Sequence, residues 1–147
     1  MWVVALRRYL VASACGNLLW EFAQLPLYTI WREGTVSNIF FAAVHCSAAD
    51  VLIALCSIVA AILLLSRQDW PAEGYGAVAM LAIAFGLAFT IFSEWLNTEV
   101  RRSWTYSELM PRLPLLSTGL SPLAQWIVVP AAALWLARRK PVESGPR

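Results

Sequence analysis

Four long apolar segments, separated by short charged stretches, limit the possible folds of this chain more than any other feature of its sequence. An α-helix needs about 20 residues to cross the hydrocarbon core of a bilayer, and each segment is about that long. The segments and their connections use almost the whole chain, so we expect one transmembrane domain over residues 1–140. A short disordered tail is expected over residues 141–147. The expected spans cover about residues 9–31, 39–65, 76–97 and 119–137.

The composition agrees with an all-α integral membrane protein. Hydrophobic residues make up 60% of the 147 residues and charged residues only 14%, whereas soluble domains contain about 45–50% and about 25% respectively. The net charge of +2 is small, and no basic run is present that would indicate nucleic-acid binding. We therefore expect a four-helix bundle whose first partner is the lipid bilayer.

Basic residues near the ends of the expected spans predict the orientation. Cytoplasmic loops of membrane proteins are enriched in Lys and Arg. With the amino terminus inside, the inner side carries the larger number of basic residues. Both termini are therefore expected in the cytoplasm, with the loop over residues 99–117 outside. The inner residues are Arg7, Arg8, Arg67, Arg138, Arg139 and Lys140, and the outer ones are Arg32, Arg101, Arg102 and Arg112.

A polar stripe runs along one face of the first expected span. Its four members fall within roughly a 60° arc of an α-helix, at about 100° per residue. A polar stripe inside a membrane needs polar partners on neighbouring helices. The stripe consists of Asn17, Glu21, Gln24 and Tyr28, and the partners on the other spans are His45, Asp50, Glu94, Asn97 and Gln125.

The depths of these residues predict where they meet. A helix rises about 1.5 Å per residue, so Glu21 and Asp50 come to a similar depth near the middle of the bilayer. His45, Gln24, Gln125 and Glu94 lie between that depth and the outer surface, and the inner halves of the spans carry no comparable set. We therefore expect a polar pocket that opens outward and has Glu21 and Asp50 at its floor.

The expected pocket is rich in carboxyl groups. Glu21, Asp50 and Glu94 lie within the spans, whereas no Lys or Arg does. Unpaired carboxylates in hydrocarbon are costly, so these groups could be protonated, share protons or hold a cation. Two carboxylates in one low-dielectric site cannot both ionise cheaply. We therefore expect Glu21 and Asp50 to meet, and at least one of them to be neutral at pH 7.

Acid–base chemistry on a lipid is one functional interpretation of this pocket. A carboxylic acid that an apolar site keeps neutral can donate a proton to an unactivated substrate. The substrate would be a lipid or isoprenoid that enters sideways from the bilayer. The catalytic candidates are Glu21, Asp50 and Glu94, and the ligand-binding candidates are Asn17, Gln24, His45, Asn97 and Gln125.

Metal or ion handling is a second interpretation. The side chains of His45, Asp50, Glu21 and Glu94 are suitable transition-metal ligands. His45 and Asp50, however, are separated by about 140° round a helix. The chain also lacks the Glu-x-x-His pair of di-iron bundles, and the sequence names no cofactor. A proton or ion pathway would use the same acids, and four spans would then have to oligomerise.

A structural, accessory or ligand-binding subunit is the third interpretation, and the sequence favours it. Interhelical hydrogen bonds in membranes contribute about 0.6–2 kcal/mol each. A polar cluster of this size could therefore serve to specify how the helices pack. The partners of such a subunit would be a second copy of the chain or a larger membrane complex.

Two local patterns predict how individual helices bend and pack. Pro26 cannot donate to the carbonyl oxygen of Phe22, so we expect a kink one turn beyond Glu21. Small residues recur every fourth position over residues 82–90 and lead to Glu94. Small residues at this spacing allow close helix contact in membranes, so this row is expected at a packed interface.

Two further patterns concern the connection before the last span. Thr105 and Glu108 have the spacing of a capping box, which predicts a short helical turn before Pro111. Ser121 followed by Pro122 is typical of a helix start, with Ser121 as the N-cap residue.

Three motifs resemble those of a family of small bacterial four-span membrane proteins. They are WEFAQLPLY at 20–28, HCSAAD at 45–50 and SEWLNTEVRRSW at 93–104. This resemblance implies the four-span fold and no particular activity. Four spans with internal acids are also similar in architecture, though not in motifs, to emopamil-binding-protein-like sterol isomerases.

Overall fold

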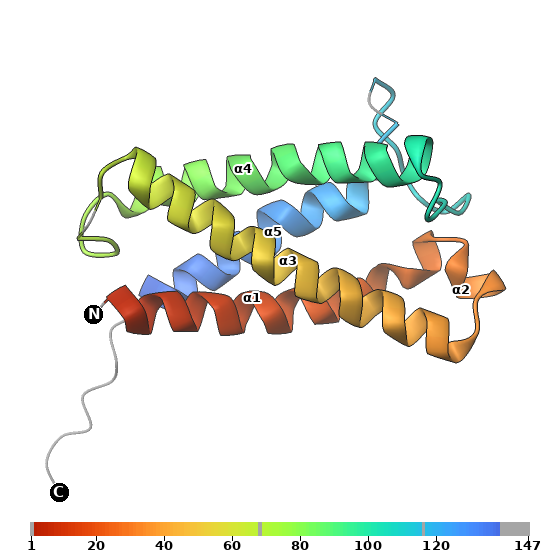
Figure 1. Cartoon of the computed structure of the whole chain (residues 1–147), viewed down its shortest axis with the longest axis horizontal. Helices are drawn as coiled ribbons and strands as arrows, with labels where there is room; N and C mark the ends of the chain where they lie inside the picture. Colours follow the sequence, from red (N-terminus) through yellow and green to blue (C-terminus); the bar gives the residue numbers. More distant parts are fainter. Residues whose placement is uncertain (1, 68, 116, 139–147) are drawn as a thin grey trace, which may run out of the picture.

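The four apolar segments form four long helices in a computed structural model of the chain, which describes residues 2–67, 69–115 and 117–138 (Figure 1). The long helices are α1 (Trp2–Gln24), α3 (Val36–Leu64), α4 (Tyr75–Trp95) and α5 (Leu120–Arg138). Three short helical segments also occur, namely η1 (Leu25–Leu27), α2 (Ile30–Glu33) and η2 (Leu96–Val100). The tail expected over residues 141–147 lies outside the described residues.

The long helices pack as a bundle, so the expected all-α fold is confirmed. Helix α1 packs against α3 and α5, and α4 packs against the same two helices from the other side. In Figure 1, α3 crosses the bundle obliquely, close to α4 at their shared loop and close to α1 near α2.

Within the described residues, three helical stretches are long and apolar enough to cross a membrane. They are Val36–Leu64, Tyr75–Val100 and Leu120–Arg138. Helix α1 is not among them, although it is 23 residues long. Arg7 and Arg8 near its start and the polar stripe toward its end make it less apolar than the other three.

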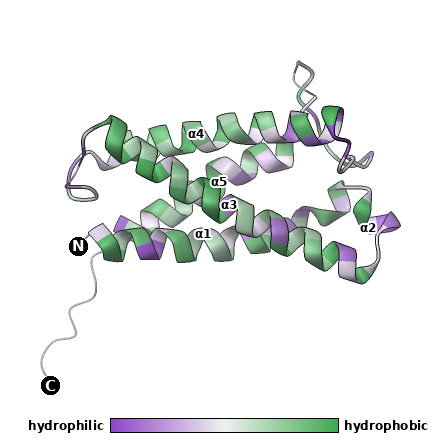
Figure 2. Cartoon of the chain, in the orientation of Figure 1, coloured by the Kyte–Doolittle hydropathy of each residue, from purple (hydrophilic) through white to green (hydrophobic). Residues whose placement is uncertain are grey.

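The outer surface of the bundle is apolar. Large hydrophobic side chains are exposed on all four long helices, among them Leu19, Phe41, Met80 and Trp135. Figure 2 shows hydrophobic colour along most of α3 and α4, with hydrophilic colour gathered in the loops at both ends. An exposed apolar surface of this extent marks contact with lipid or protein. These faces therefore agree with a bilayer environment.

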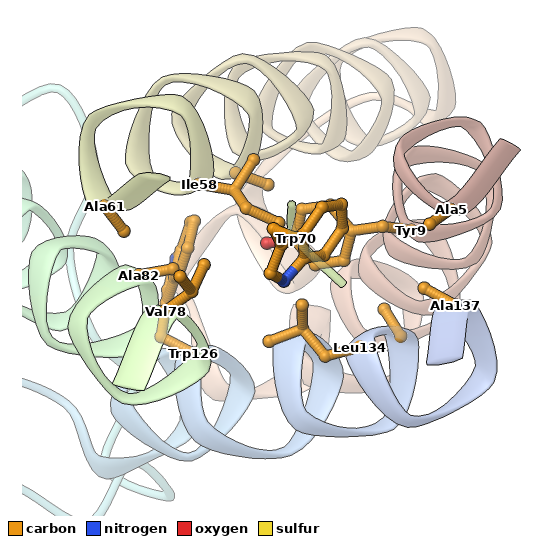
Figure 3. Packing of buried hydrophobic residues seen from close by; sticks show 12 residues of the cluster. Ala5, Tyr9, Ile58, Ala61, Trp70, Val78, Ala82, Trp126, Leu134 and Ala137 are labelled. Carbon is orange, nitrogen blue, oxygen red and sulfur yellow. The ribbon is translucent and has the colours of Figure 1, made fainter. Parts of the chain in front are cut away.

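A hydrophobic core fills the end of the bundle near the amino terminus. Side chains from the four long helices point toward one another there, including Tyr9, Ile58, Val78 and Leu134 (Figure 3). Trp70, from the loop between α3 and α4, is also buried in this cluster. The apolar core thus occupies one end and leaves the other end to polar side chains.

The first helix begins and ends earlier than the sequence pattern predicted. It covers Trp2–Gln24, whereas the expected span covered about residues 9–31. The expected kink at Pro26 is wrong, because the chain leaves the α-helix at Gln24 and enters the η1 turn. Pro26 has no N–H group to continue the helical ladder. The direction of the chain therefore changes between η1 and α2 and not within one bent helix.

The row of small residues on α4 lies at a packed interface, as expected. Ala82, Gly86, Thr90 and Glu94 are all buried. A Cβ atom added to Gly86 would lie 2.0 Å from Cε3 of the Trp126 ring. Because only glycine leaves room for this ring, α4 and α5 approach each other closely at this point.

The long loop after α4 forms a single turn directly before Pro111, as predicted, but Ser107 and not Thr105 holds it. Met110 N–H donates to the Ser107 carbonyl (3.2 Å), and Leu109 N–H donates to the Ser107 hydroxyl (3.3 Å). The loop backbone also pairs with the chain between α1 and α2, where Thr29 N–H donates to the Thr105 carbonyl (3.0 Å) and Ser107 N–H donates to the Leu27 carbonyl (2.9 Å). The loop is thereby held across the α1–α2 connection.

Candidate functional site

The amide side chain of Gln125 lies at the centre of a buried polar network. It projects from α5 and is only 2% exposed. Its Nε2 group donates to Asn17 Oδ1 (3.1 Å), Glu21 Oε1 (3.2 Å) and Asp50 Oδ2 (3.0 Å). Its Oε1 atom accepts from Gln24 Nε2 (3.2 Å). One residue of α5 thus links polar groups of α1 and α3.

This network brings Glu21 and Asp50 together, as their depths predicted. Both carboxyl groups accept from the same nitrogen of Gln125. An amide NH₂ group carries two hydrogens, and here it faces three oxygen acceptors. Glu21 Oε1 also accepts from Gln24 Nε2 (2.9 Å), and Asp50 accepts from the Trp126 side chain. An ionised carboxylate has about four acceptor positions, so this pair can still accept a hydrogen bond from a ligand.

A second layer of hydrogen bonds fixes the orientation of the network. Gln24 Nε2 donates to Glu21 Oε1 (2.9 Å), and Gln24 Oε1 accepts from Ser121 Oγ (2.8 Å). Ser121 Oγ in turn accepts from the indole of Trp20 (3.1 Å). The prediction of Ser121 as the N-cap of the last helix is wrong, because α5 begins at Leu120. The hydroxyl group instead belongs to the site.

Glu94 is bound by the loop rather than by the Gln125 network. The Tyr106 hydroxyl donates to Glu94 Oε2 and accepts from the Gly119 N–H group (3.0 Å). The ring of Tyr28 packs against the ring of Tyr106, with centroids 5.5 Å apart. Burial, and then the Glu94 carboxylate, raises the pKa of Tyr106 well above its ordinary value. The phenol therefore stays protonated at neutral pH and continues to donate to Glu94.

A cavity of about 670 Å³ lies beside this network and is lined by residues of all four long helices. Apolar and aromatic side chains, among them Phe41, Ile53, Phe89 and Trp126, form much of its wall. Asn17 does not line the cavity, although it holds Gln125 in place from α1. The other seven candidate residues from the sequence do line it: Glu21, Gln24, His45, Asp50, Glu94, Asn97 and Gln125.

His45 and Asn97 lie at the cavity without joining the network. His45 is exposed and stacks on Phe41, with ring centroids 5.4 Å apart. Asn97 Nδ2 donates to the Ser93 carbonyl (2.8 Å) of its own helix. In the part of the chain that the structure describes, no group of three or more His, Cys, Asp and Glu side chains could hold a metal ion. The metal set suggested by the sequence is therefore not assembled.

Four further residues belong to the site although the sequence did not single them out for it. Arg101 and Trp104 line the cavity, Tyr106 binds Glu94 and Ser121 binds Gln24. The sequence gives one indication of where Trp104 and Tyr106 lie, because Trp and Tyr are enriched at the membrane–water boundary. The partners of these residues are distant in sequence, so spacing alone could not have identified them.

Comparison of the chain with protein-family models, with curated proteins and with solved structures found no match. The resemblance of the three motifs to a small bacterial family accordingly stays a prediction. The arguments about function that follow depend on the geometry and chemistry of the cavity.

Proposed function

We propose that this chain is a four-span protein of the bacterial inner membrane that binds an amphipathic ligand in the cavity beside Gln125. Helix α1 would be the fourth span. It packs along α3 and α5 and exposes apolar side chains such as Val11, Leu19 and Phe22. Both termini would lie in the cytoplasm, so that the cavity opens toward the outside.

The observation that carries this proposal is a cavity with a polar floor and largely apolar walls. Its volume of about 670 Å³ falls within the range of about 300–1,000 Å³ that is usual for small-molecule sites. Apolar walls with a few convergent polar groups are typical of sites that bind one oriented ligand. A structural polar cluster needs no cavity of this size, which favours ligand binding over a purely structural role.

The exposed part of the lining indicates the route of entry. Phe41, Ala49 and Leu52 of α3 and Phe89 of α4 line the cavity and are also exposed. The cavity thus reaches the outer surface between α3 and α4, two of the helices suited to cross a membrane. A lipid or an isoprenoid could enter there directly from the bilayer. Its polar end would donate to the surplus acceptors at Glu21 and Asp50.

Proton transfer to the bound lipid is the second candidate function. It is favoured by one observation, namely that Glu21 and Asp50 share one amide donor. If one carboxyl group is protonated and the other is not, the pair contains both an acid and a base. The ligand would then be a substrate, and the chain an enzyme.

The proposed topology predicts which loops are accessible from outside the cell. Leu115, in the loop before α5, is 98% exposed, and Glu73, in the α3–α4 loop, is also exposed. In a chain without Cys15, Cys46 and Cys56, we expect Leu115→Cys to react with an impermeant thiol reagent in intact cells. Glu73→Cys should react only after lysis. The opposite pattern, or equal labelling at both positions, would contradict the proposed orientation.

The proposed binding site predicts different effects for two neighbouring alanines. Ala48 and Ala49 are both exposed, but only Ala49 lines the cavity. In lipid nanodiscs, we expect Ala49→Trp to weaken binding of a long-chain isoprenol or a long-chain fatty acid about tenfold or more, because the indole fills the entrance. Ala48→Trp should bind like the wild type. Equal affinities for both variants, or no binding by the wild type, would overturn the proposal.

The same experiment in heavy water separates binding from proton transfer. An enzyme that moves protons would incorporate deuterium at carbon atoms of a bound isoprenol, and Glu21→Gln would bind the isoprenol without this exchange. A binding protein would leave the carbon-bound hydrogens unlabelled in both the wild type and the variant.

A further inference from the structure

One cationic side chain lies at the mouth of this acidic cavity. Among the described residues, Arg101 is the only Lys or Arg that lines the cavity, and it is exposed. The η2 turn places it there, because Arg101 N–H donates to the Leu96 carbonyl (2.8 Å) where the turn ends. The next residue, Arg102, is also exposed but does not line the cavity.

The cavity therefore presents opposite polar chemistry at its two ends. The floor, at Gln125 and Asp50, has surplus hydrogen-bond acceptors, whereas the mouth offers the guanidinium group of Arg101. Arginine binds carboxylate and phosphate groups with paired N–H donors. Apolar residues such as Phe41, Ile53 and Phe89 line the cavity as well.

We propose that the ligand is a long-chain anion with a hydroxyl group near the middle of its chain. Its carboxylate or phosphate binds Arg101, and its hydroxyl group donates to the Gln125–Asp50 floor. The apolar chain between these groups lies along the aromatic wall, and the remainder leaves between α3 and α4. This inference rests on the proposed ligand-binding function and specifies the chemistry of that ligand.

The positions of the lining residues place Arg101 and Gln125 at different levels of the bundle. Gly86 packs against Trp126, which neighbours Gln125 on α5. Between Gly86 and Arg101, the cavity is lined by Thr90, Ser93, Glu94 and Asn97, so Arg101 lies up to roughly 20 Å along α4 and η2 from the level of the Gly86–Trp126 contact. The side chain of Arg101 can cover several ångström of this distance, and the ligand must cover the rest. A hydroxyl group directly beside the anion would not reach the floor.

Four fatty-acid probes test this assignment on the wild-type protein. They are octadecanoate with a mid-chain hydroxyl, octadecanoate with a hydroxyl beside the carboxylate, plain octadecanoate, and the methyl ester of the mid-chain compound. We expect the first to bind at least about tenfold more tightly than each of the others, since each lacks one charge-assisted or hydroxyl contact. Affinities are measured in nanodiscs by displacement of a fluorescent fatty acid.

Variants at the mouth then identify the anion contact. Arg101→Gln should weaken binding of the mid-chain hydroxy acid about tenfold and leave binding of its methyl ester unchanged, whereas Arg102→Gln should alter neither. Equal binding of acid and ester, or equal effects of the two variants, would overturn this inference and leave the ligand-binding proposal intact. Failure of all four probes to bind the wild type would count against both.

Discussion

Replacing Gly86 with leucine is expected to lower the free energy of unfolding by about 3 kcal/mol, the upper part of the usual range for overpacking. A Cβ atom at this position would lie 2.0 Å from Cε3 and 2.2 Å from Cζ3 of Trp126. The Trp126 ring is buried, and it lines the cavity. It is not the end of an exposed, flexible side chain, so either the ring shifts toward the cavity or α4 and α5 separate. Thermal unfolding of the purified protein in detergent measures the effect.

Gly76→Leu is the matched control for this prediction, because it makes the same substitution in the same helix. A Cβ atom added to Gly76 would have no neighbour within 4 Å. We expect Gly76→Leu to unfold at nearly the wild-type temperature. A second variant that combines Gly86→Leu with Trp126→Ala should recover part of the loss, since it removes the clash. Equal stability of the Gly86 and Gly76 variants would show that the packing at this row is not close.

The buried face of α4 shows which part of the fold can be predicted from the sequence. The four-residue recurrence of small residues predicted a packed interface, and Ala82, Gly86, Thr90 and Glu94 are buried as a row. The signal is reliable because a small residue in an apolar helix is useful only where another helix approaches. The lengths of α3 and α5 followed from their apolar content in the same way.

The end of α1 could not be derived with the same accuracy. Apolar residues continue beyond Gln24 to Trp31, so hydropathy alone predicts one long span. The helix ends early because Pro26 interrupts the ladder and because the loop after α4 supplies other partners. Ser107 N–H donates to Leu27, and Ser107 Oγ donates to the Pro26 carbonyl (3.1 Å). These partners are about 80 positions away in sequence, and no local pattern reveals them.

The candidate site could likewise be predicted from the sequence only in part. Depth along the helices predicted that Glu21 and Asp50 meet, because rise per residue is nearly constant. It did not predict that Gln125 would join them through one amide group, nor that Glu94 would instead pair with Tyr106. Such choices depend on which way each helix is rotated and on where a loop folds back. Arg101 was expected outside the membrane, but its position at the cavity depends on the η2 turn.

The separation of the three acids has a chemical consequence. Glu94 already has a phenol donor in Tyr106, whereas Glu21 and Asp50 compete for Gln125. Glu21 and Asp50 share one amide donor, so this pair presents the acceptor positions of two carboxyl groups at one place. This distinction favours the Gln125 network over Glu94 as the place where a bound molecule is held by its polar end.

Gln125→Leu is expected to destabilise the protein by about 3 kcal/mol or more, because buried polar groups without partners cost about 1–3 kcal/mol each. Leucine has a similar volume but removes every bond that the amide makes with Asn17, Glu21, Gln24 and Asp50. Gln125 is 2% exposed, so bulk water does not easily replace those bonds. The loss should appear in thermal unfolding and in the lipid-binding assay.

Gln125→Glu distinguishes loss of the hydrogen-bond donor from loss of shape. When it is ionised, the introduced carboxylate has no N–H group and faces the two acids at Glu21 and Asp50, so we expect a loss of stability as large as that of Gln125→Leu. As the pH falls, protonation supplies one O–H donor. The uncharged form fits the buried site, so stability relative to the wild type should rise as the pH falls. Gln125→Leu should show no such recovery, because leucine does not titrate. If both variants keep wild-type stability at neutral pH, the network does not hold α1, α3 and α5 together.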